Sequence, residues 1–236
     1  MRRFHNKVKE EALSWGGGRR VIETLLDFGC GRGGDVHKWN RLGIQHVFGI
    51  DPCRSSIQEA TKRSIANSNY IFIQADNPLE WLVRECHSNS FDMISCNFVI
   101  HYFDKTQQKE ILREFFRVLE PGGTVVMTFM EGSRVFTYLQ GETVRDNGVA
   151  NIQLSFPKII IGIKDTPYFE SQASEEFLVF EKYLLKESEI IGFKTVCRHP
   201  FESIYNTLSP PPPQLSNNEK ETSFLFSSLI LLKPYE

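Results

Sequence analysis

The stretch of sequence that decides the fold is LDFGCGRGGDVHKW, residues Leu26–Trp39. An apolar run over Glu23–Phe28 leads into a glycine-rich segment, and a helical pattern follows over Asp35–Leu42. Glycine permits a tight turn from strand to helix and lets a ligand approach the backbone. Three glycines fit the pattern GxGxxG: Gly29, Gly31 and Gly34. The stretch therefore predicts a nucleotide-binding turn, but the pattern alone also fits a dinucleotide site.

On both sides of this turn, short apolar runs alternate with helical stretches from residue 21 to residue 129. The predicted strands are Glu23–Phe28, His46–Ile50, Tyr70–Gln74, Phe91–Cys96 and Thr124–Phe129. The predicted helices are Asp35–Leu42, Ser55–Ala66, Leu79–Cys86 and Gln107–Leu119, the last stopped by Pro121-Gly122-Gly123. This alternation predicts an α/β fold, with a parallel sheet covered by helices on both faces.

The rest of the chain is less regular, and we expect residues 1–236 to form a single domain in three parts. We expect an amphipathic helix over residues 1–20 and the cofactor-binding core over residues 21–130. We expect residues 131–236 to form insertions around the substrate and a closing strand. In the third part we expect strands over Asn151–Ile163 and Glu176–Tyr183, a helix over Lys186–Ile191, a loop at Ser209–Pro213 and a strand over Phe224–Leu232.

The composition excludes several classes of protein. Hydrophobic residues make up 41% and charged residues 24%, which is ordinary for a globular domain, and the net charge of −2 argues against a duplex-wrapping protein. No apolar run approaches the roughly 20 residues of a membrane span. The five cysteines include no CxxC pair, so we expect neither a disulfide framework nor a zinc ribbon, and we expect a reducing intracellular compartment. We find no metal-ligand motif.

Two acidic residues stand at the ends of predicted strands. Asp51 ends the second strand, where a carboxylate can accept hydrogen bonds from ribose hydroxyls, and Asp76 follows the third, where it can face an adenine amino group. Each alone is more often a helix cap or turn residue. Together with the glycine turn they predict an adenosine site. Because no second mononucleotide half follows, we favour a methyltransferase that uses S-adenosylmethionine over a dehydrogenase.

Five segments, in order, resemble the mRNA cap guanine-N7 methyltransferases. They are FHNKVK (Phe4–Lys9), LDFGCGRGGDVHKW (Leu26–Trp39), FDMISCNFVIHY (Phe91–Tyr102), EEFLVF (Glu175–Phe180) and ETSFLFSSLILL (Glu221–Leu232). The resemblance implies a class I, Rossmann-like methyltransferase fold, doubly wound and mostly parallel, with an antiparallel closing strand. It also implies methyl transfer from S-adenosylmethionine to guanine N7 of the GpppN end of capped mRNA.

The resemblance extends to the source and partners of the chain. It is similar to a methyltransferase domain of a capping enzyme from a large DNA virus of the African swine fever virus type. Other capping-enzyme domains would then be its partners, with a stimulatory subunit as a further candidate. The host cytoplasm would be its location if viral, and the nucleus if cellular.

The resemblance also assigns roles to individual residues. Those implied to contact or frame S-adenosylmethionine are Lys9, Gly29, Gly31, Asp35, Asp51, Asp76, Asn97 and Tyr102. Those implied to act on the guanine are His101, Tyr102 and Glu176. Those implied to hold the rest of the cap are His5 and Asn6 beside the pocket, and Arg32 and Arg63 toward the phosphates.

Several positions depart from the family pattern. His5 stands where the family has Asn, and Arg32 where it has Lys, which keeps the charge and changes the hydrogen-bond geometry. Asn97 replaces a longer Gln. The cap-facing Tyr of the family falls opposite Phe224 or Leu225, neither of which carries a hydroxyl group.

The chemistry of this reaction fits the absence of a catalytic triad or HExxH motif from the sequence. Guanine N7 carries no proton at neutral pH, so the transfer needs proximity, orientation and electrostatics and no general base or metal. A carboxylate at Glu176 would stabilise the cationic product. Two alternatives stay open: a small-molecule methyltransferase, and a noncatalytic module that binds cap or a partner.

Overall fold

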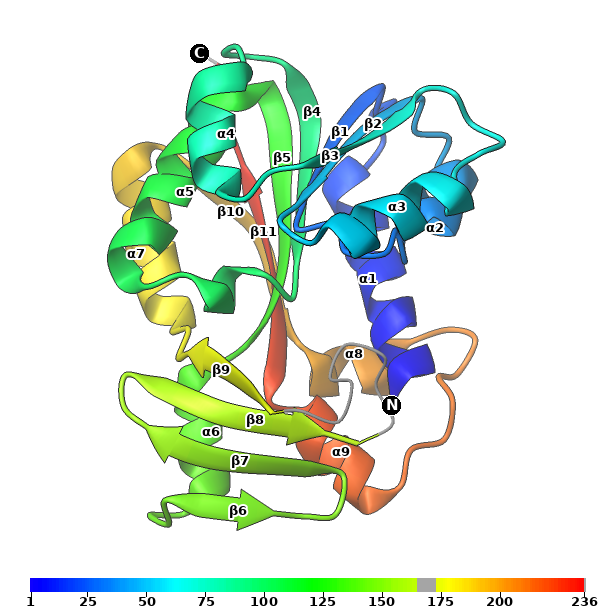
Figure 1. The fold of residues 1–236 in the computed structure, drawn as a ribbon. Coiled ribbons are helices and arrows are strands. Elements are labelled where there is room, and N and C mark those ends of the chain that lie inside the picture. The colour runs from blue at the N-terminus through cyan, green and yellow to red at the C-terminus, as the bar shows by residue number, and fades with distance from the viewer. Residues whose placement is uncertain (165–172, 236) are drawn as a thin grey trace.

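A seven-stranded sheet forms the centre of the molecule (Figure 1). The structure, a computed structural model, describes residues 1–164 and 173–235. The strand order is β10-β11-β5-β4-β1-β2-β3. The bounds are Thr24–Phe28 (β1), His46–Asp51 (β2), Tyr70–Gln74 (β3), Phe91–Asn97 (β4), Leu119–Met130 (β5), Lys194–Pro200 (β10) and Phe226–Leu232 (β11). Strands β1 to β5 pair in parallel, and β11 is antiparallel to both its neighbours. The predicted sheet, with its antiparallel closing strand, is confirmed.

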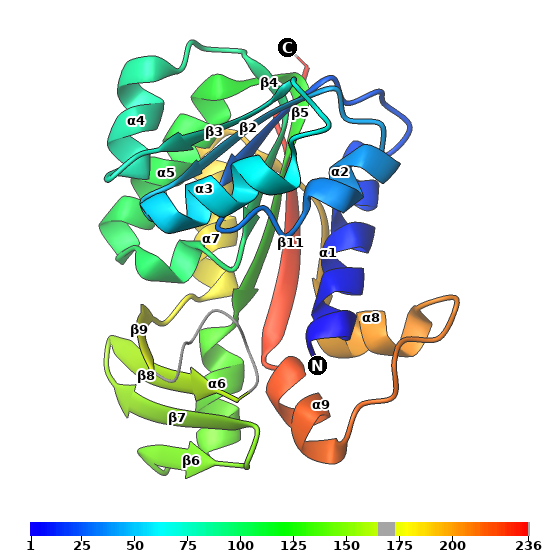
Figure 2. The same cartoon turned by 45° about the vertical axis from the view of Figure 1, so that its right-hand side comes forward.

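Helices cover both faces of this sheet (Figures 1 and 2). On one face lie α1 (Arg2–Gly17), α2 (Val36–Arg41) and α3 (Arg54–Arg63), and on the other α4 (Pro78–Glu85), α5 (Lys105–Val118) and α7 (Glu181–Ile191). Successive residues of a strand point to opposite faces. Accordingly Leu25 packs in the cluster that contains Trp39 of α2, whereas Leu26 packs in the cluster that contains Phe115 of α5. No helix in residues 1–164 and 173–235 combines the length and apolar character that crossing a bilayer demands.

A second, four-stranded antiparallel sheet lies beyond the carboxyl ends of the central parallel strands (Figure 1). Its strands are Val144–Asp146 (β6), Ala150–Ser155 (β7), Lys158–Ile163 (β8) and Ser174–Phe177 (β9). Around it lie the 3-10 helix η1 (Ile100–Tyr102) and the helices α6 (Gly132–Leu139), α8 (Phe201–Thr207) and α9 (Asn217–Ser223). One apolar cluster joins Phe4 of α1, Ile159 of β8 and Phe226 of β11. The smaller sheet therefore packs as part of the structure around the strand ends.

Two boundaries predicted from the sequence are wrong. Pro121-Gly122-Gly123 does not break the chain before a fifth strand, because these residues belong to β5, where the Gly122 N–H donates to the Lys233 carbonyl. The strand expected over Glu176–Tyr183 ends at Phe177, and α7 begins at Glu181. The apolar FLVF segment suggested a longer strand, but Leu178 and Val179 are buried in the turn between the two elements.

Candidate functional site

The glycine loop lies where the chain direction around the sheet reverses, between β1 and β4, the place where open α/β sheets bind ligands. Gly29, Gly31 and Gly33 all have positive φ, at 80°, 50° and 67°. A Cβ at Gly29 would lie 2.4 Å from the Cγ2 atom of Val99, so this glycine permits close packing. A Cβ at Gly31 would meet no atom within 4 Å. The backbone at Gly31 therefore borders open space that a ligand can approach.

Asp51 ties the end of β2 to this loop. Its Oδ2 atom accepts a hydrogen bond from the Gly31 N–H at 2.9 Å, and its Oδ1 atom accepts one from the Cys53 N–H at 2.9 Å. Burial raises the pKa of this half-buried carboxyl. Asp76 is exposed beyond the adjacent strand, and Gln74, the cross-strand partner of Asp51, donates to it at 3.1 Å. The two predicted carboxylates thus follow neighbouring strands on the side of the glycine loop.

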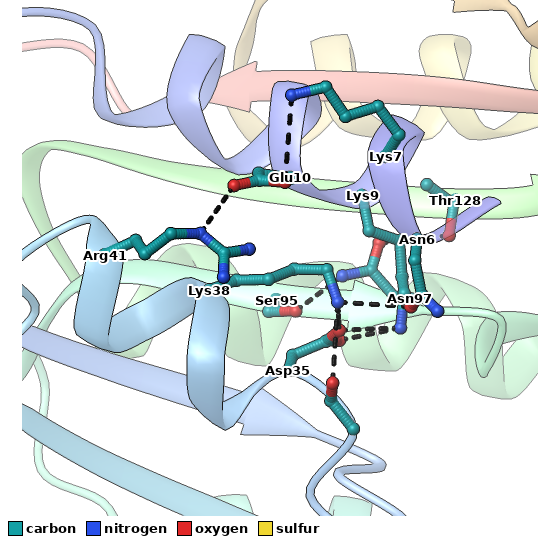
Figure 3. A network of polar contacts seen from close by, with 11 residues as sticks. Asn6, Lys7, Lys9, Glu10, Asp35, Lys38, Arg41, Ser95, Asn97 and Thr128 are labelled. Carbon is teal, nitrogen blue, oxygen red and sulfur yellow. Dashed lines mark hydrogen bonds and ion pairs between the residues drawn. The ribbon is translucent and has the colours of Figure 1, made fainter. Parts of the chain in front are cut away.

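A buried charge cluster joins α1 to the glycine loop (Figure 3). Asp35 Oδ1 lies 2.7 Å from Lys9 Nζ and 2.6 Å from Lys38 Nζ, and all three side chains are more than 90% buried. Burial alone would raise the pKa of Asp35, but the two lysines outweigh it and hold the pKa below its usual value. Lys38 was not among the residues predicted from the sequence. The signal was its position three residues after Asp35, on the same side of α2.

A second polar group stands at the ends of β1, β4 and β5. The Asn97 side chain donates to Ser95 Oγ at 2.8 Å and accepts from Thr128 Oγ1 at 3.0 Å. Beneath the loop, burial raises the pKa of Asp27 to about 7, the charge of Asp35 adds to this rise, and a hydrogen bond from Ser95 opposes it. Asp27 was also missed, although an acidic residue inside the apolar run LLDF was a visible signal.

His101 on η1 and Glu176 on β9 face each other in the interior. Their Nε2 and Oε1 atoms are 3.7 Å apart, and each residue is 4% exposed. Burial lowers the pKa of His101 to about 3 and raises the pKa of Glu176 to about 7. The imidazole is therefore neutral at pH 7 and the contact is no ion pair. Its Nδ1 atom is buried and has no hydrogen-bond partner in the described part of the chain. Tyr102 beside it is 52% exposed.

His5 lies within an aromatic cluster at the start of α1. Its ring stacks on Phe98 at 5.7 Å between centroids, meets Phe201 and Phe226 edge-on, and lies 3.0 Å from Ser223 Oγ. Burial, then the charges of the N-terminus and Lys9, lower its pKa to about 3. The imidazole is therefore a neutral packing group that borders the strand ends.

The remaining predicted residues are spread around this centre. Asn6 accepts a hydrogen bond from Lys38 Nζ at 3.1 Å. Arg32 is exposed in the glycine loop, and Arg63 is exposed on α3 with its Nε atom 3.1 Å from Glu59. Leu225, one of the two residues opposite the tyrosine of the family, packs in an apolar cluster and has no polar group to offer a ligand.

The family model for the mRNA (guanine-N(7))-methyltransferase domain matches residues 1–212 of this sequence. The chain belongs to this family. Among its relatives, the mRNA cap guanine-N(7) methyltransferase of Caenorhabditis elegans is 31% identical over 152 residues, which cover 57% of this chain and 40% of that protein. The enzyme of the same name from Drosophila melanogaster is 27% identical over 237 residues, covering 87% of this chain and 55% of that protein. The chain thus spans about half the length of these relatives, or less.

Solved structures establish the fold of this family member. The methyltransferase CcbJ from Streptomyces caelestis superposes with a TM-score of 0.64 at 14% identity, covering 96% of this chain and 89% of that one. The N-methyltransferase NodS from Bradyrhizobium japonicum, solved with S-adenosyl-L-homocysteine, gives a TM-score of 0.61 at 13% identity, covering 98% and 88%. The fold is the Rossmann-like fold of class I methyltransferases, as the sequence predicts.

Proposed function

We propose that this chain transfers the methyl group of S-adenosylmethionine to N7 of the guanine cap of mRNA. Membership of the mRNA (guanine-N(7))-methyltransferase domain family supports the reaction. The structural observation that carries the proposal is the pair formed by His101 and Glu176. A neutral imidazole and a buried carboxylate, 3.7 Å apart beyond the glycine loop, offer the hydrogen-bonding groups that the edge of a guanine requires.

The residues at the strand ends fit S-adenosylmethionine. The open space beside Gly31 is a cradle that a single added Cβ would enter. Asp51 at the edge of this cradle would accept hydrogen bonds from the ribose, and Lys9 would hold the carboxylate of the methionine moiety. Asp76 and Asn97 would border the adenosine. When bound, this group supplies a methyl carbon that its positive sulfur has already activated.

His101 and Glu176 would orient the guanine. The Nδ1 atom of His101 is buried without a partner among the described residues, and a buried polar atom costs stability until it is paired. Glu176 would accept from the amino edge of the ring. Because methyl transfer to N7 makes the guanine cationic, the ionised carboxylate would also stabilise the developing charge. Tyr102, exposed and edge-on to the His101 ring, would lie between the two ligands.

The rate enhancement would come from positioning. Guanine N7 presents a lone pair with no proton to remove, so no side chain needs to act as a base. Holding two reactants in line lowers a barrier by roughly 7–11 kcal/mol in well-oriented systems. The residues of this site would therefore act by binding and orientation, with Glu176 adding electrostatic stabilisation.

Methylation of capped RNA tests the proposal. The protein is incubated with methyl-labelled S-adenosylmethionine and GpppRNA, the RNA is digested to the cap, and the position of the label is determined. We expect label on guanine N7. Label on a small molecule only, or heat of cofactor binding without turnover, would favour the two alternatives instead.

The same assay includes a matched pair of variants on β9. Glu176→Gln removes the buried charge, whereas Glu175→Gln removes a neighbouring charge that pairs with Lys158 at 3.3 Å on the surface. We expect turnover to fall at least tenfold for Glu176→Gln and to stay within twofold for Glu175→Gln. Equal losses in the two variants would contradict the role of Glu176.

We also propose a setting for the chain. It would act beside other domains of a capping enzyme from a large DNA virus, in the reducing host cytoplasm. The five cysteines, all free thiols in the structure, support a reducing compartment. Copurification of the native protein from infected cells, compared with the nuclear fraction of uninfected cells, tests source and location. Addition of the copurifying subunits to the isolated chain tests whether one stimulates turnover.

A further inference from the structure

A hollow of about 310 Å³ opens between α1 and α2, outside the groups assigned above to cofactor and guanine. Its wall includes the cations Arg3, Lys7, Lys38 and Arg41 and the single carboxylate Glu10. Lys38 is paired with the buried Asp35, so the cations nearer the surface are Arg3, Lys7 and Arg41. Against the carboxylates Glu10 and Glu11 they leave a surplus of one positive charge, in a chain whose net charge is −2. The local charge is thus opposite to that of the whole molecule.

Helix α1 carries Lys7 and Glu10, and α2 carries Lys38 and Arg41, which lie close to one another (Figure 3). Lys7 Nζ lies 3.8 Å from Glu10 and 3.2 Å from Glu11, and Arg41 Nε lies 2.8 Å from Glu10. These ion pairs are open to water, with the Arg41 side chain 56% exposed. Exposed pairs are weak, about 0–1 kcal/mol each, so both cations can still bind an anion that replaces or joins Glu10.

The hollow is continuous with the glycine loop. Gly34 of that loop lines it, and Lys38 in its wall donates to the Gly34 carbonyl at 3.4 Å while pairing with Asp35. Asn6, which also lines the hollow, follows His5 of the aromatic cluster on α1. A polyanion that leaves the strand ends past the glycine loop would therefore meet this row of cations next.

We propose that the hollow between α1 and α2 binds the phosphodiester backbone of the first nucleotides after the cap. This inference rests on the proposed function, because it takes capped RNA as the substrate. A row of Arg and Lys binds phosphates in any sequence, since phosphate contacts fix position and carry no base information. The site would therefore bind the RNA whatever its first nucleotides are.

The test compares two substrates and one triple variant, Arg3→Gln, Lys7→Gln and Arg41→Gln. For a capped RNA of about 20 nucleotides, we expect KM to rise at least tenfold. For the dinucleotide GpppG, which has no phosphodiester beyond the cap, we expect KM to change less than twofold. The salt dependence of RNA binding should also weaken, because each lost contact to a single strand removes about 0.7 from the slope of log K against log salt.

A control of equal charge lies on the opposite face of the sheet. The control is a triple variant that also removes three positive charges, but far from the hollow (Figure 1): Arg84→Gln on α4, Arg113→Gln on α5 and Lys186→Gln on α7. We expect KM for both substrates to stay within twofold. An equal rise in the control, or no rise in the first variant, overturns the proposal. Thermal unfolding by circular dichroism checks that both variants fold.

A binding measurement separates failure of this proposal from failure of the proposed function. Fluorescence anisotropy with a labelled, uncapped 20-nucleotide RNA reports on the hollow even if no methylation is found. At least tenfold weaker binding by the first triple variant supports the RNA site. Equal affinity of the unaltered protein for polyglutamate, lost in the same variant, would indicate an acidic protein partner and overturn the RNA site.

Discussion

His101 and Glu176 lie 3.7 Å apart, Nε2 to Oε1, yet they are a neutral base and a weakened acid rather than an ion pair. Burial lowers the pKa of His101 to about 3 and raises that of Glu176 to about 7. Charged groups are buried at a cost unless they are paired. The interior therefore keeps His101 uncharged, and Glu176 gains or loses its proton near neutral pH.

The pH dependence of turnover should follow Glu176. In the proposed reaction the Glu176 carboxylate would stabilise the product only when ionised, so kcat/KM should rise with pH through about 7, the pKa of this group in the free protein. Initial rates with GpppG between pH 5.5 and 8.5 measure this. Glu176→Gln should lower the plateau and remove the rise, while Glu175→Gln should keep it. A rise of the same shape in Glu176→Gln would assign the titration to another group.

The stability of the fold should change with pH in the opposite direction. The pKa of Glu176 is higher in the folded than in the unfolded state, so its favourable contribution is complete below about 4.5 and is lost as pH rises through about 7. The loss is up to about 3 kcal/mol. Asp27, also raised to about 7, acts with the same sign. Urea unfolding should therefore show Glu176→Gln gaining stability relative to the native sequence between pH 5 and pH 8; an unchanged difference would contradict the burial effect.

Two glycines of the loop should respond differently to alanine. Gly29→Ala places a Cβ 2.4 Å from Val99 at positive φ and should cost about 3 kcal/mol of unfolding free energy. Gly31→Ala meets no neighbour, so it should cost only about 1 kcal/mol and lose most cofactor affinity, because the Cβ enters the open cradle. Urea unfolding and calorimetry with S-adenosylhomocysteine measure both. In the double variant Gly29→Ala, Val99→Ala, the smaller side chain at position 99 makes room for the new Cβ, so part of the lost stability should return.

Lys38 should control cofactor affinity through Lys9. In Lys38→Met, Lys9 is the one cation left beside the Asp35 carboxylate. Asp35 then holds Lys9 more firmly, so Lys9 is less available to the carboxylate of a ligand. We expect roughly tenfold weaker binding of S-adenosylhomocysteine, about 1.4 kcal/mol. Binding of 5′-methylthioadenosine, which lacks that carboxylate, should stay within twofold. An equal loss for the two ligands in calorimetry would indicate a purely structural role.

His5→Asn, which installs the family residue, should destabilise this chain more at high than at low pH. The ring packs on Phe98, Phe201 and Phe226, and its loss should cost about 1–2 kcal/mol at pH 8. The pKa of His5 is near 3 when folded and 6.5 as its ordinary value, so the native protein loses stability as pH falls below 6.5. The variant lacks this loss. Urea unfolding at pH 8 and pH 5 should thus show the difference shrinking; a constant difference would place the ring in water.

The central sheet could be predicted from the sequence because its signals are local. Each parallel strand is a short apolar run, and Leu25 and Leu26 face different layers of the core, so the run has no polar alternation. The boundary at Phe177 could not be predicted, because FLVF is apolar in either conformation. Tertiary contacts determine where the chain leaves the strand, and one of them is the isolated bridge between Glu131 and Val179.

Residue patterns alone indicated the candidate site only at the end of a strand or at the glycine turn, whereas Lys9, His101 and Glu176 were implied by the family resemblance. Asp51 ends β2, as its place after the apolar run predicts, and its hydrogen bond from Gly31 was seen only in the structure. The cluster around Asp35 could not be predicted, because Lys38 lies three residues away but the second cation, Lys9, comes from a distant segment. Asp27 was missed because its hydrogen-bond partner Ser95 is also distant in sequence. The ring of His5 shows the same limit: its substitution for Asn makes sense only beside Phe98.

The packing of α1 against the last strand sets an order for folding. Phe4 and Val8 share one apolar cluster with Leu225 and Phe226, and His5 touches Ser223, 218 positions later in the chain. On the ribosome, Phe4 and Val8 cannot complete this cluster until β11 has been synthesised, although Ala12 and Leu13 pack on the earlier residues Leu25 and Trp39. Such late closure leaves the growing chain open to aggregation, and the exposed end of α1 is a segment that a chaperone would have to shield.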